Sequence, residues 1–292
     1  MSNQLAAIKK EVFDVVSASI SGYVRSGEIA LPEKYSFGNA IKSAWLILQE
    51  TVDIDKKPVL EVCTKPSIIN ALQQMVYQGL SPDKKQCYFI PFGNKLTLIR
   101  SYFGSVSVAK RVDPTITDIC YDVVYKGDTF NYEKRRGKTI IAEHKQQLDN
   151  IGSNNIIAAY CSIFRGDDET TFIMTMEEIK AAWKKSKMNS VTDNGTIKAG
   201  STHAQYTKDM AIKTVVNHAC KYVINTSDDG SLVHDAALRS YDETTSRETI
   251  INDEIKDNAN MTDLDFEQTE SDVIEESFTT EEIPEEEDLP NF

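Results

Sequence analysis

The sequence predicts an α+β fold in which antiparallel β-hairpins form small sheets packed with helices, with a helical N-terminal region and a disordered acidic C-terminal tail. Apolar residues recur at helical spacing before residue 80. Alternating stretches flank short turns at several places between residues 86 and 175, and helical spacing returns after Thr175. Hairpins followed by helices are typical of α+β proteins and not of βαβ nucleotide-binding folds.

Three helices are predicted in the first part of the chain. Residues 4–25 place Val12, Val16 and Ile20 on one apolar stripe. A second helix begins after Ser36, a plausible N-cap, and a third runs from about Pro66 to Gly79.

Three strand pairs and two further helices are predicted next. The first pair, 86–91 and 95–101, flanks one turn. The second pair, 119–126 and 129–133, is expected to form around Gly127-Asp128, and the third, 156–164 and 170–175, encloses a polar turn. A capping box between Thr175 and Glu178 starts a helix there. The last helix is expected at 203–225.

Composition excludes several classes of protein. The 292 residues are 40% hydrophobic and 26% charged, as in ordinary globular domains, and no apolar run reaches the ~18 residues of a membrane span. The five cysteines stand alone, which argues against a disulfide scaffold or a CxxC zinc site. With no secretory pattern at the N-terminus, we expect a cytoplasmic protein with reduced thiols.

The net charge of −13 divides unevenly along the chain. Residues 241–292 hold 19 acids against two bases, whereas residues 1–240 carry a net +4. A mildly basic body suits a polyanion, and the acidic segment has too few large apolar groups to fold alone. We therefore expect an N-terminal helical segment (1–35), a core (36–235) and a largely disordered acidic tail (236–292).

No catalytic residue, metal site or cofactor is predicted. Gly137-Lys138-Thr139 looks like the end of a phosphate loop, but Tyr132 stands where its first glycine belongs, which argues against ATP hydrolysis. The histidines show no metal-ligand spacing. A metal-dependent nuclease using Asp83 and Glu143 stays open as an alternative, as does a purely structural oligomer.

Cationic and aromatic residues are interleaved in three stretches. Single-stranded nucleic acid needs this combination, because cations neutralise phosphates and rings support unpaired bases. The stretches contain Lys95, Arg100, Tyr102, Phe103, Lys110 and Arg111; Tyr132, Lys134, Arg135, Arg136 and Lys138; and Trp183, Lys184, Lys185 and Lys187.

Residues 70–111 resemble the signature region of the RecT family of phage and prophage single-strand DNA annealing recombinases. The likeness rests on Gly79-Leu80 with Pro82, on residues 90–94 (Ile-Pro-Phe-Gly-Asn), and on Tyr102, Gly104 and Ala109-Lys110-Arg111. Further on it includes Val124-Tyr125, Asp128, Phe130, Tyr132-Glu133, His144, Ile157-Ala158-Ala159-Tyr160 and the helix from Met210 to Tyr222.

The resemblance implies a non-enzymatic protein that binds single strands without ATP, forms rings or helical filaments, and anneals complementary strands in homologous recombination. Its partners would be single-stranded DNA, the annealed duplex intermediate and further copies of the chain. We expect Arg100, Lys110 and Arg111 to bind phosphates, with Lys95, Lys138, Lys185 and Lys213 as weaker candidates and Tyr102 and Phe103 as base platforms.

The acidic C-terminal end, closing on Leu289-Pro290-Asn291-Phe292, is similar to the tip by which bacterial single-strand-binding proteins recruit partners. Two roles are open for the tail. It would contact a phage exonuclease or host single-strand-binding and repair proteins, or it would compete with DNA for the basic surface.

Overall fold

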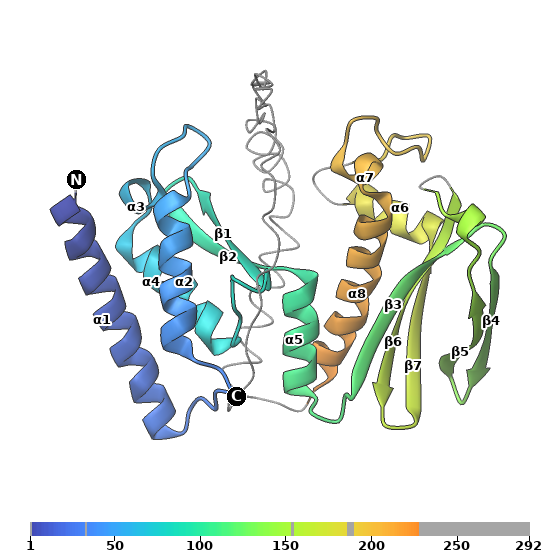
Figure 1. Ribbon diagram of the computed structural model, residues 1–292, viewed down its shortest axis with the longest axis horizontal. Coiled ribbons are helices and arrows are strands. Elements are labelled where there is room, and N and C mark those ends of the chain that lie inside the picture. Colours follow the sequence, from blue (N-terminus) through green and yellow to red (C-terminus); the bar gives the residue numbers. More distant parts are fainter. Residues whose placement is uncertain (1, 33, 153–154, 186–189, 228–292) are drawn as a thin grey trace, which may run out of the picture.

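The computed structural model describes residues 2–32, 34–152, 155–185 and 190–227, and it confirms the α+β fold. Two lobes lie side by side along the long axis of the molecule (Figure 1). We call residues 2–100 the helical lobe and residues 118–227 the sheet lobe, and helix α5 lies between them. The predicted acidic tail falls outside the described residues.

Among its described residues, the helical lobe contains four helices and one hairpin. These are α1 (Ser2–Ser26), α2 (Phe37–Glu50), α3 (Val59–Val62), α4 (Lys65–Tyr77), β1 (Cys87–Phe92) and β2 (Lys95–Arg100). Three of the helices and the hairpin lie close to the predicted bounds, whereas the short helix Val59–Val62 was not predicted. The predicted stripe of Val12, Val16 and Ile20 is fully buried, and α1 packs along α4. The Ser36 side chain accepts a hydrogen bond from the Asn39 amide at 3.3 Å, which confirms this residue as the N-cap of α2.

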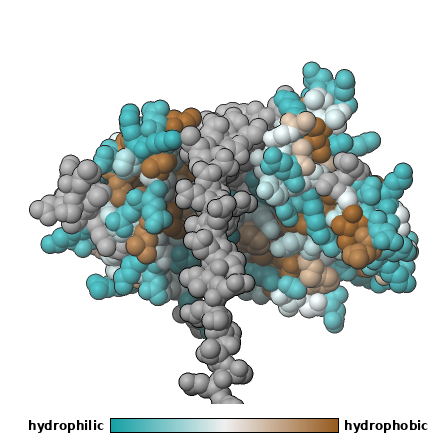
Figure 2. Space-filling model, turned by 45° about the horizontal axis from the view of Figure 1, so that its top comes forward, coloured by the Kyte–Doolittle hydropathy of each residue, from teal (hydrophilic) through white to brown (hydrophobic). Residues whose placement is uncertain are grey.

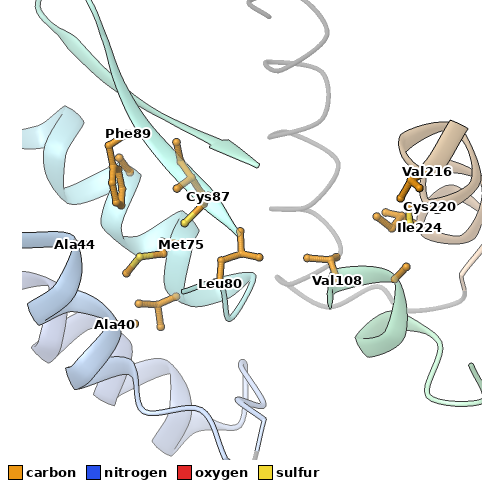
Figure 3. Packing of buried hydrophobic residues seen from close by; sticks show 14 of the residues in the cluster. Ala40, Ala44, Met75, Leu80, Cys87, Phe89, Val108, Val216, Cys220 and Ile224 are labelled. Carbon is orange, nitrogen blue, oxygen red and sulfur yellow. The ribbon is translucent and has the colours of Figure 1, made fainter. Parts of the chain in front are cut away.

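Helix α5 (Tyr102–Val112) was not predicted from apolar spacing, yet it joins the two lobes. Its N-cap, Ser101, accepts a hydrogen bond from Gly104. Val108 of α5 faces Val216, Cys220 and Ile224 of the last helix, α8 (Thr207–Thr226), as Figure 3 shows. Because one continuous buried cluster includes residues of both lobes, the core holds them together.

The sheet lobe has three layers. Its strands and helices are β3 (Asp118–Tyr125), β4 (Thr129–Arg135), β5 (Lys138–Lys145), the 3-10 turn η1 (Leu148–Asn150), β6 (Ile156–Arg165), β7 (Asp168–Thr175), α6 (Met176–Lys185), α7 (Thr202–Gln205) and α8 (Thr207–Thr226). An antiparallel sheet of order β3-β6-β7 packs against α8, while β4 and β5 form a separate hairpin that contacts β7.

The predicted pairing of β3 with β4 around Gly127-Asp128 is wrong. Strand β3 pairs with β6, and β4 pairs with β5. The Asp128 carboxylate accepts hydrogen bonds from the Tyr125 amide at 2.9 Å and from Asn150 Nδ2 at 2.8 Å. These bonds turn the chain out of the sheet, so β4 starts a hairpin of its own.

The other predictions for this lobe hold with two refinements. The β6–β7 turn is tighter than expected, because the strands continue to Arg165 and from Asp168. Thr175 and Glu178 form the predicted capping box, with a 2.8 Å bond from the Thr175 amide to the Glu178 carboxylate. The last helix is interrupted at Tyr206, whose backbone is not helical.

Strand β3 forms one edge of its sheet, and carboxylates occupy some of its backbone donors. The amides of Ile119 and Val123 donate to the side chains of Asp118 and Asp122, both at 2.8 Å. With the bond from the Tyr125 amide to Asp128, three amides of this strand are satisfied by side chains.

The surface is largely polar where Figure 2 shows it, with small apolar patches between the hydrophilic residues of the two lobes. Within the described ranges, no helix is long and apolar enough to cross a membrane. All five cysteines are free thiols, and four of them are buried.

Candidate nucleic-acid interface

Three parts of the sheet lobe and the end of α5 lie along one rim of the molecule, which we call the lower edge. The C-terminal ends of α5 and α8, the β6–β7 turn and the β4–β5 turn all lie at the bottom of the molecule in Figure 1. Two cavities adjoin there, of about 500 and 360 Å³, and both are lined by Arg165, Val223 and Thr226. Their size is that of ligand-binding clefts.

The β4–β5 hairpin ends at the lower edge in a cluster of cations. We call Lys134, Arg135, Arg136 and Lys138 the basic turn, and all four side chains are exposed. Arg136 and Gly137 have φ values of 51° and 84°, as a tight two-residue hairpin turn requires. Among the described residues, Glu133 and Asp168 are the acids that pair with these four cations, so this part of the surface keeps a positive charge.

A buried carboxylate fixes the hairpin to the sheet. The Asp128 side chain is fully buried, and His144 Nε2 of β5 lies 3.5 Å from its Oδ2. Burial alone would raise the pKa of Asp128, but hydrogen bonds from Asn150, the Tyr125 amide and His144 outweigh this effect and lower it. Phe130 also stacks on Tyr160 of β6, with ring centroids 5.5 Å apart. The hairpin therefore holds its basic turn at a defined place.

The larger cavity, which we call the hairpin groove, lies between the start of β5, the strands β6 and β7, and the last turns of α8. Lys138 lines it and forms an ion pair with Asp168 at 2.5 Å. Arg165 lines both cavities, and its Nε donates to Asp113, just after α5, at 2.9 Å. Burial alone would raise the pKa of Asp113, but hydrogen bonds from Thr115 and the ion pair with Arg165 outweigh this effect and lower it.

Lys110 continues the basic surface at the C-terminal end of α5. Its Nζ lies 3.2 Å from Asp118, and its side chain is 38% exposed. The bond from the Ile119 amide, followed by that from Lys110, lowers the pKa of Asp118. A cation at a helix C-terminus is favoured by the helix dipole, and an exposed ion pair of this kind opens at little cost. The structure thus brings Lys110 and Lys138 to the same edge.

Arg100 and Arg111, two of the three leading phosphate candidates, point into the protein. Arg100 is 4% exposed and donates to the Gln78 side chain at 2.9 Å. Arg111 donates to the backbone oxygens of Gln78 and Gly79 at the end of α4. Burial lowers the pKa of Arg111. Both side chains support the junction between the lobes, so we leave them out of the proposed interface.

Gly79 is required at this junction for two reasons. Its φ of 57° lies in the left-handed region, and a Cβ there would collide with the Arg111 guanidinium. The glycine and Arg111, which stand far apart in the sequence, thus form one helix-capping unit.

The predicted base platforms lie at the other end of α5. The rings of Tyr102 and Phe103 stand 4.1 Å apart, and Tyr102 also meets Tyr121 edge-on at 6.0 Å. Phe103 is 42% exposed, whereas Tyr102 is half-buried and packs on the core. Burial raises the pKa of Tyr102. Phe103 and the exposed Tyr88 of β1 therefore offer open rings, apart from the lower edge.

The remaining candidates are dispersed. Lys95 lies at the turn of the β1–β2 hairpin in the helical lobe. Lys185 ends α6 and is exposed, and Lys213 lies on α8 beside the α6–α7 region. The structure does not bring these three lysines to the lower edge.

A buried histidine near Lys213 makes stability depend on pH. His203 is 4% exposed, lies against the Trp183 ring, and has its pKa lowered to about 4 by burial and by Lys213. In the unfolded chain His203 takes up a proton near pH 6.5, whereas in the folded protein it stays neutral down to about pH 4. The free energy of unfolding therefore has its full value above pH 6.5 and falls as the pH drops toward 4. Between pH 7 and 5 we expect a loss of about 2 kcal/mol from this residue, measured by urea unfolding.

His203→Gln should flatten this pH dependence, because glutamine does not titrate. An unaltered slope in His203→Gln would contradict the assignment.

The nuclease alternative finds no assembled site in the described structure. Asp83 lies in the loop before β1 and accepts a hydrogen bond from Ser43, whereas Glu143 lies on β5 at the other end of the molecule. Among the described residues, no three histidine, cysteine, aspartate or glutamate side chains gather as a metal site would require.

Sequence reasoning missed Arg165 and Tyr222, which line the hairpin groove. Arg165 had a weak signal, since it is a cation just before the turn Gly166-Asp167. Tyr222 had none, because an exposed ring on an amphipathic helix looks like any other surface residue.

An exposed cationic rim such as the lower edge is typical of proteins that bind nucleic acid through its backbone. The sequence model of the RecT family matches residues 38–256, and the chain belongs to this family. It is thus a single-strand annealing protein of DNA recombination, which binds single-stranded DNA. No curated protein and no solved structure shows a significant match.

Proposed function

We propose that the protein anneals complementary single strands without ATP and holds each strand along the lower edge. The observation that carries this proposal is that the basic turn, Arg165 and Lys110 all lie at the lower edge, where Lys138 and Arg165 line the hairpin groove. Gly137, Lys138 and Thr139 form a hairpin turn and the start of a strand. A phosphate loop would lead into a helix, so this segment does not have the geometry of an ATP site.

The physical chemistry of annealing needs a scaffold and no fuel. Lysine and arginine side chains neutralise phosphates and release counterions, which favours binding of any sequence. Contacts to phosphates leave the pairing edges of the bases open to a second strand. Duplex formation releases about 1.4 kcal/mol per base step, which is enough to drive pairing once two strands are held together.

We further propose that residues 36–235 carry both annealing and self-assembly, and that several copies assemble as a ring or helical filament in the cytoplasm. Assembly along one strand would multiply weak contacts into tight overall binding. The acidic residues 236–292 would contact an exonuclease or single-strand-binding and repair proteins, because their charge repels DNA. A chain lacking residues 241–292 should then lose such partners and gain DNA affinity only slightly, because only the long-range field changes. A gain in affinity of about a hundredfold would instead favour direct competition with DNA.

The annealing proposal is tested with two complementary oligonucleotides labelled as a fluorescence donor and acceptor. Added in succession to the protein without nucleotide, they should pair several-fold faster than in buffer alone, since the protein concentrates and aligns them. Non-complementary oligonucleotides should bind equally well and give no signal. A requirement for a triphosphate, or shortening of labelled DNA in magnesium, would contradict the proposal.

A further inference from the structure

We propose that the hairpin groove is a nucleobase site, in which the ring of Tyr222 stacks on one unpaired base while the surrounding cations hold the adjoining phosphates. This inference rests on the proposed function and goes beyond it. It names the ring that contacts the DNA and gives the lower edge a reason to prefer single strands.

Tyr222 has the placement that a stacking platform requires. It lies in the last turns of α8, lines the hairpin groove, and is 54% exposed. Its ring packs against Phe172 of β7, with centroids 5.3 Å apart. Phe172 is itself packed on the core, so Tyr222 is an exposed ring held from behind. A ring fixed in this way loses little conformational entropy when a base stacks on it.

The walls of the groove supply the other contacts that a nucleotide needs. Lys138 and Arg165 both line it. Each already forms an ion pair, Lys138 with Asp168 and Arg165 with Asp113. The hydroxyl-bearing residues Thr139 and Thr170 line the same space and suit the polar edge of a base. Phosphates on either side of the base would lie against the cations, as in other single-strand grooves.

The size of the site sets its selectivity. A cavity of about 500 Å³ has room for a nucleotide but not for a base pair with its two backbones. A duplex could fill it only by flipping a base out of the stack, at a cost of a few kcal/mol. The groove should therefore bind an unpaired base and release it when the complementary strand pairs.

The smaller cavity extends this path toward Lys110. It shares Arg165, Val223 and Thr226 with the hairpin groove and reaches Asp113 and Pro114 after α5. A strand with one base against Tyr222 could thus continue along the lower edge from the basic turn to the end of α5.

The test compares Tyr222→Leu with Tyr206→Leu in the full chain. Leucine at 222 keeps an apolar contact with Phe172 but removes the ring, and Tyr206 is an equally exposed tyrosine at the opposite end of α8. The ligands are an oligothymidine, an abasic oligomer of the same length and a duplex, each measured by fluorescence anisotropy. We expect Tyr222→Leu to bind oligothymidine about tenfold more weakly and the other two as the wild type does.

Tyr206→Leu should match the wild type with all three ligands, and Tyr222→Phe should retain the affinity for oligothymidine because it keeps the ring. Wild-type affinity in Tyr222→Leu, or an equal loss with the abasic oligomer, would overturn the nucleobase site while leaving the annealing function intact. Failure of the wild type to bind oligothymidine in dilute buffer would instead overturn the proposed function.

Discussion

Replacing the four cations of the basic turn by glutamine should weaken binding of a single-stranded oligonucleotide about a hundredfold at ~0.1 M salt. Each phosphate contact releases counterions, so the loss of four contacts should make the plot of log affinity against log salt less steep by about three units. The loss should be the same for every base sequence, because phosphates carry no sequence information. Anisotropy titrations over a range of salt concentrations measure both quantities.

The matched control removes four cations from the helical lobe. Lys10, Lys42, Lys56 and Lys57 are all exposed, and their replacement by glutamine changes the net charge equally. This variant should show a small drop in affinity and nearly the wild-type salt slope, since only the long-range field changes. Equal effects in the two variants would mean that general charge, and not the lower edge, binds the DNA.

Gly104→Ala should be the most destabilising glycine-to-alanine substitution in the described part of the chain, at about 3 kcal/mol. The first turn of α5 lies directly on the backbone of Gln86, whose oxygen a Cβ at position 104 would overlap. Arg100 crowds the same point from the other side, with its Cγ 2.8 Å from the position of that Cβ. Because the obstacle is backbone, relief requires α5 to move away from the hairpin.

Chemical unfolding measures this effect, with Gly22→Ala as control. Gly22 lies within α1, and a Cβ there would meet nothing within 4 Å. Alanine at this helical position should stabilise the protein by roughly 0.5–1 kcal/mol. A Gly104→Ala variant as stable as the wild type would show that α5 does not pack as closely as the structure places it.

Local patterns predicted most elements, because helices and strands depend on residues close in sequence. The stripe through Val12, Val16 and Ile20 and the capping box at Thr175 are signals of this kind. The pairing of β3 was not predictable in this way. Adjacent strands commonly pair across a short turn, and the buried hydrogen bonds of Asp128 that prevent it here depend on Asn150, which is distant in sequence.

The sequence predicted the residue types of the candidate site better than it predicted where they lie in the structure. A basic and aromatic surface was expected, and the structure gathers Lys110 and Lys138 at one edge. Sequence alone does not distinguish an exposed arginine from one that caps a buried helix end. Arg111 looks like a surface cation until the carbonyl oxygens of Gln78 and Gly79 are seen beside it.

The carboxylates along β3 reduce the tendency of this protein to aggregate at high local concentration. A strand with vacant amides invites extension by a neighbouring molecule, and the risk grows wherever many molecules gather on one polymer. Asp118, Asp122 and Asp128 already satisfy three of those amides. Neighbouring copies of the protein on DNA would therefore not pair edge to edge through β3 and form insoluble fibres. They could then dissociate once the strands had paired.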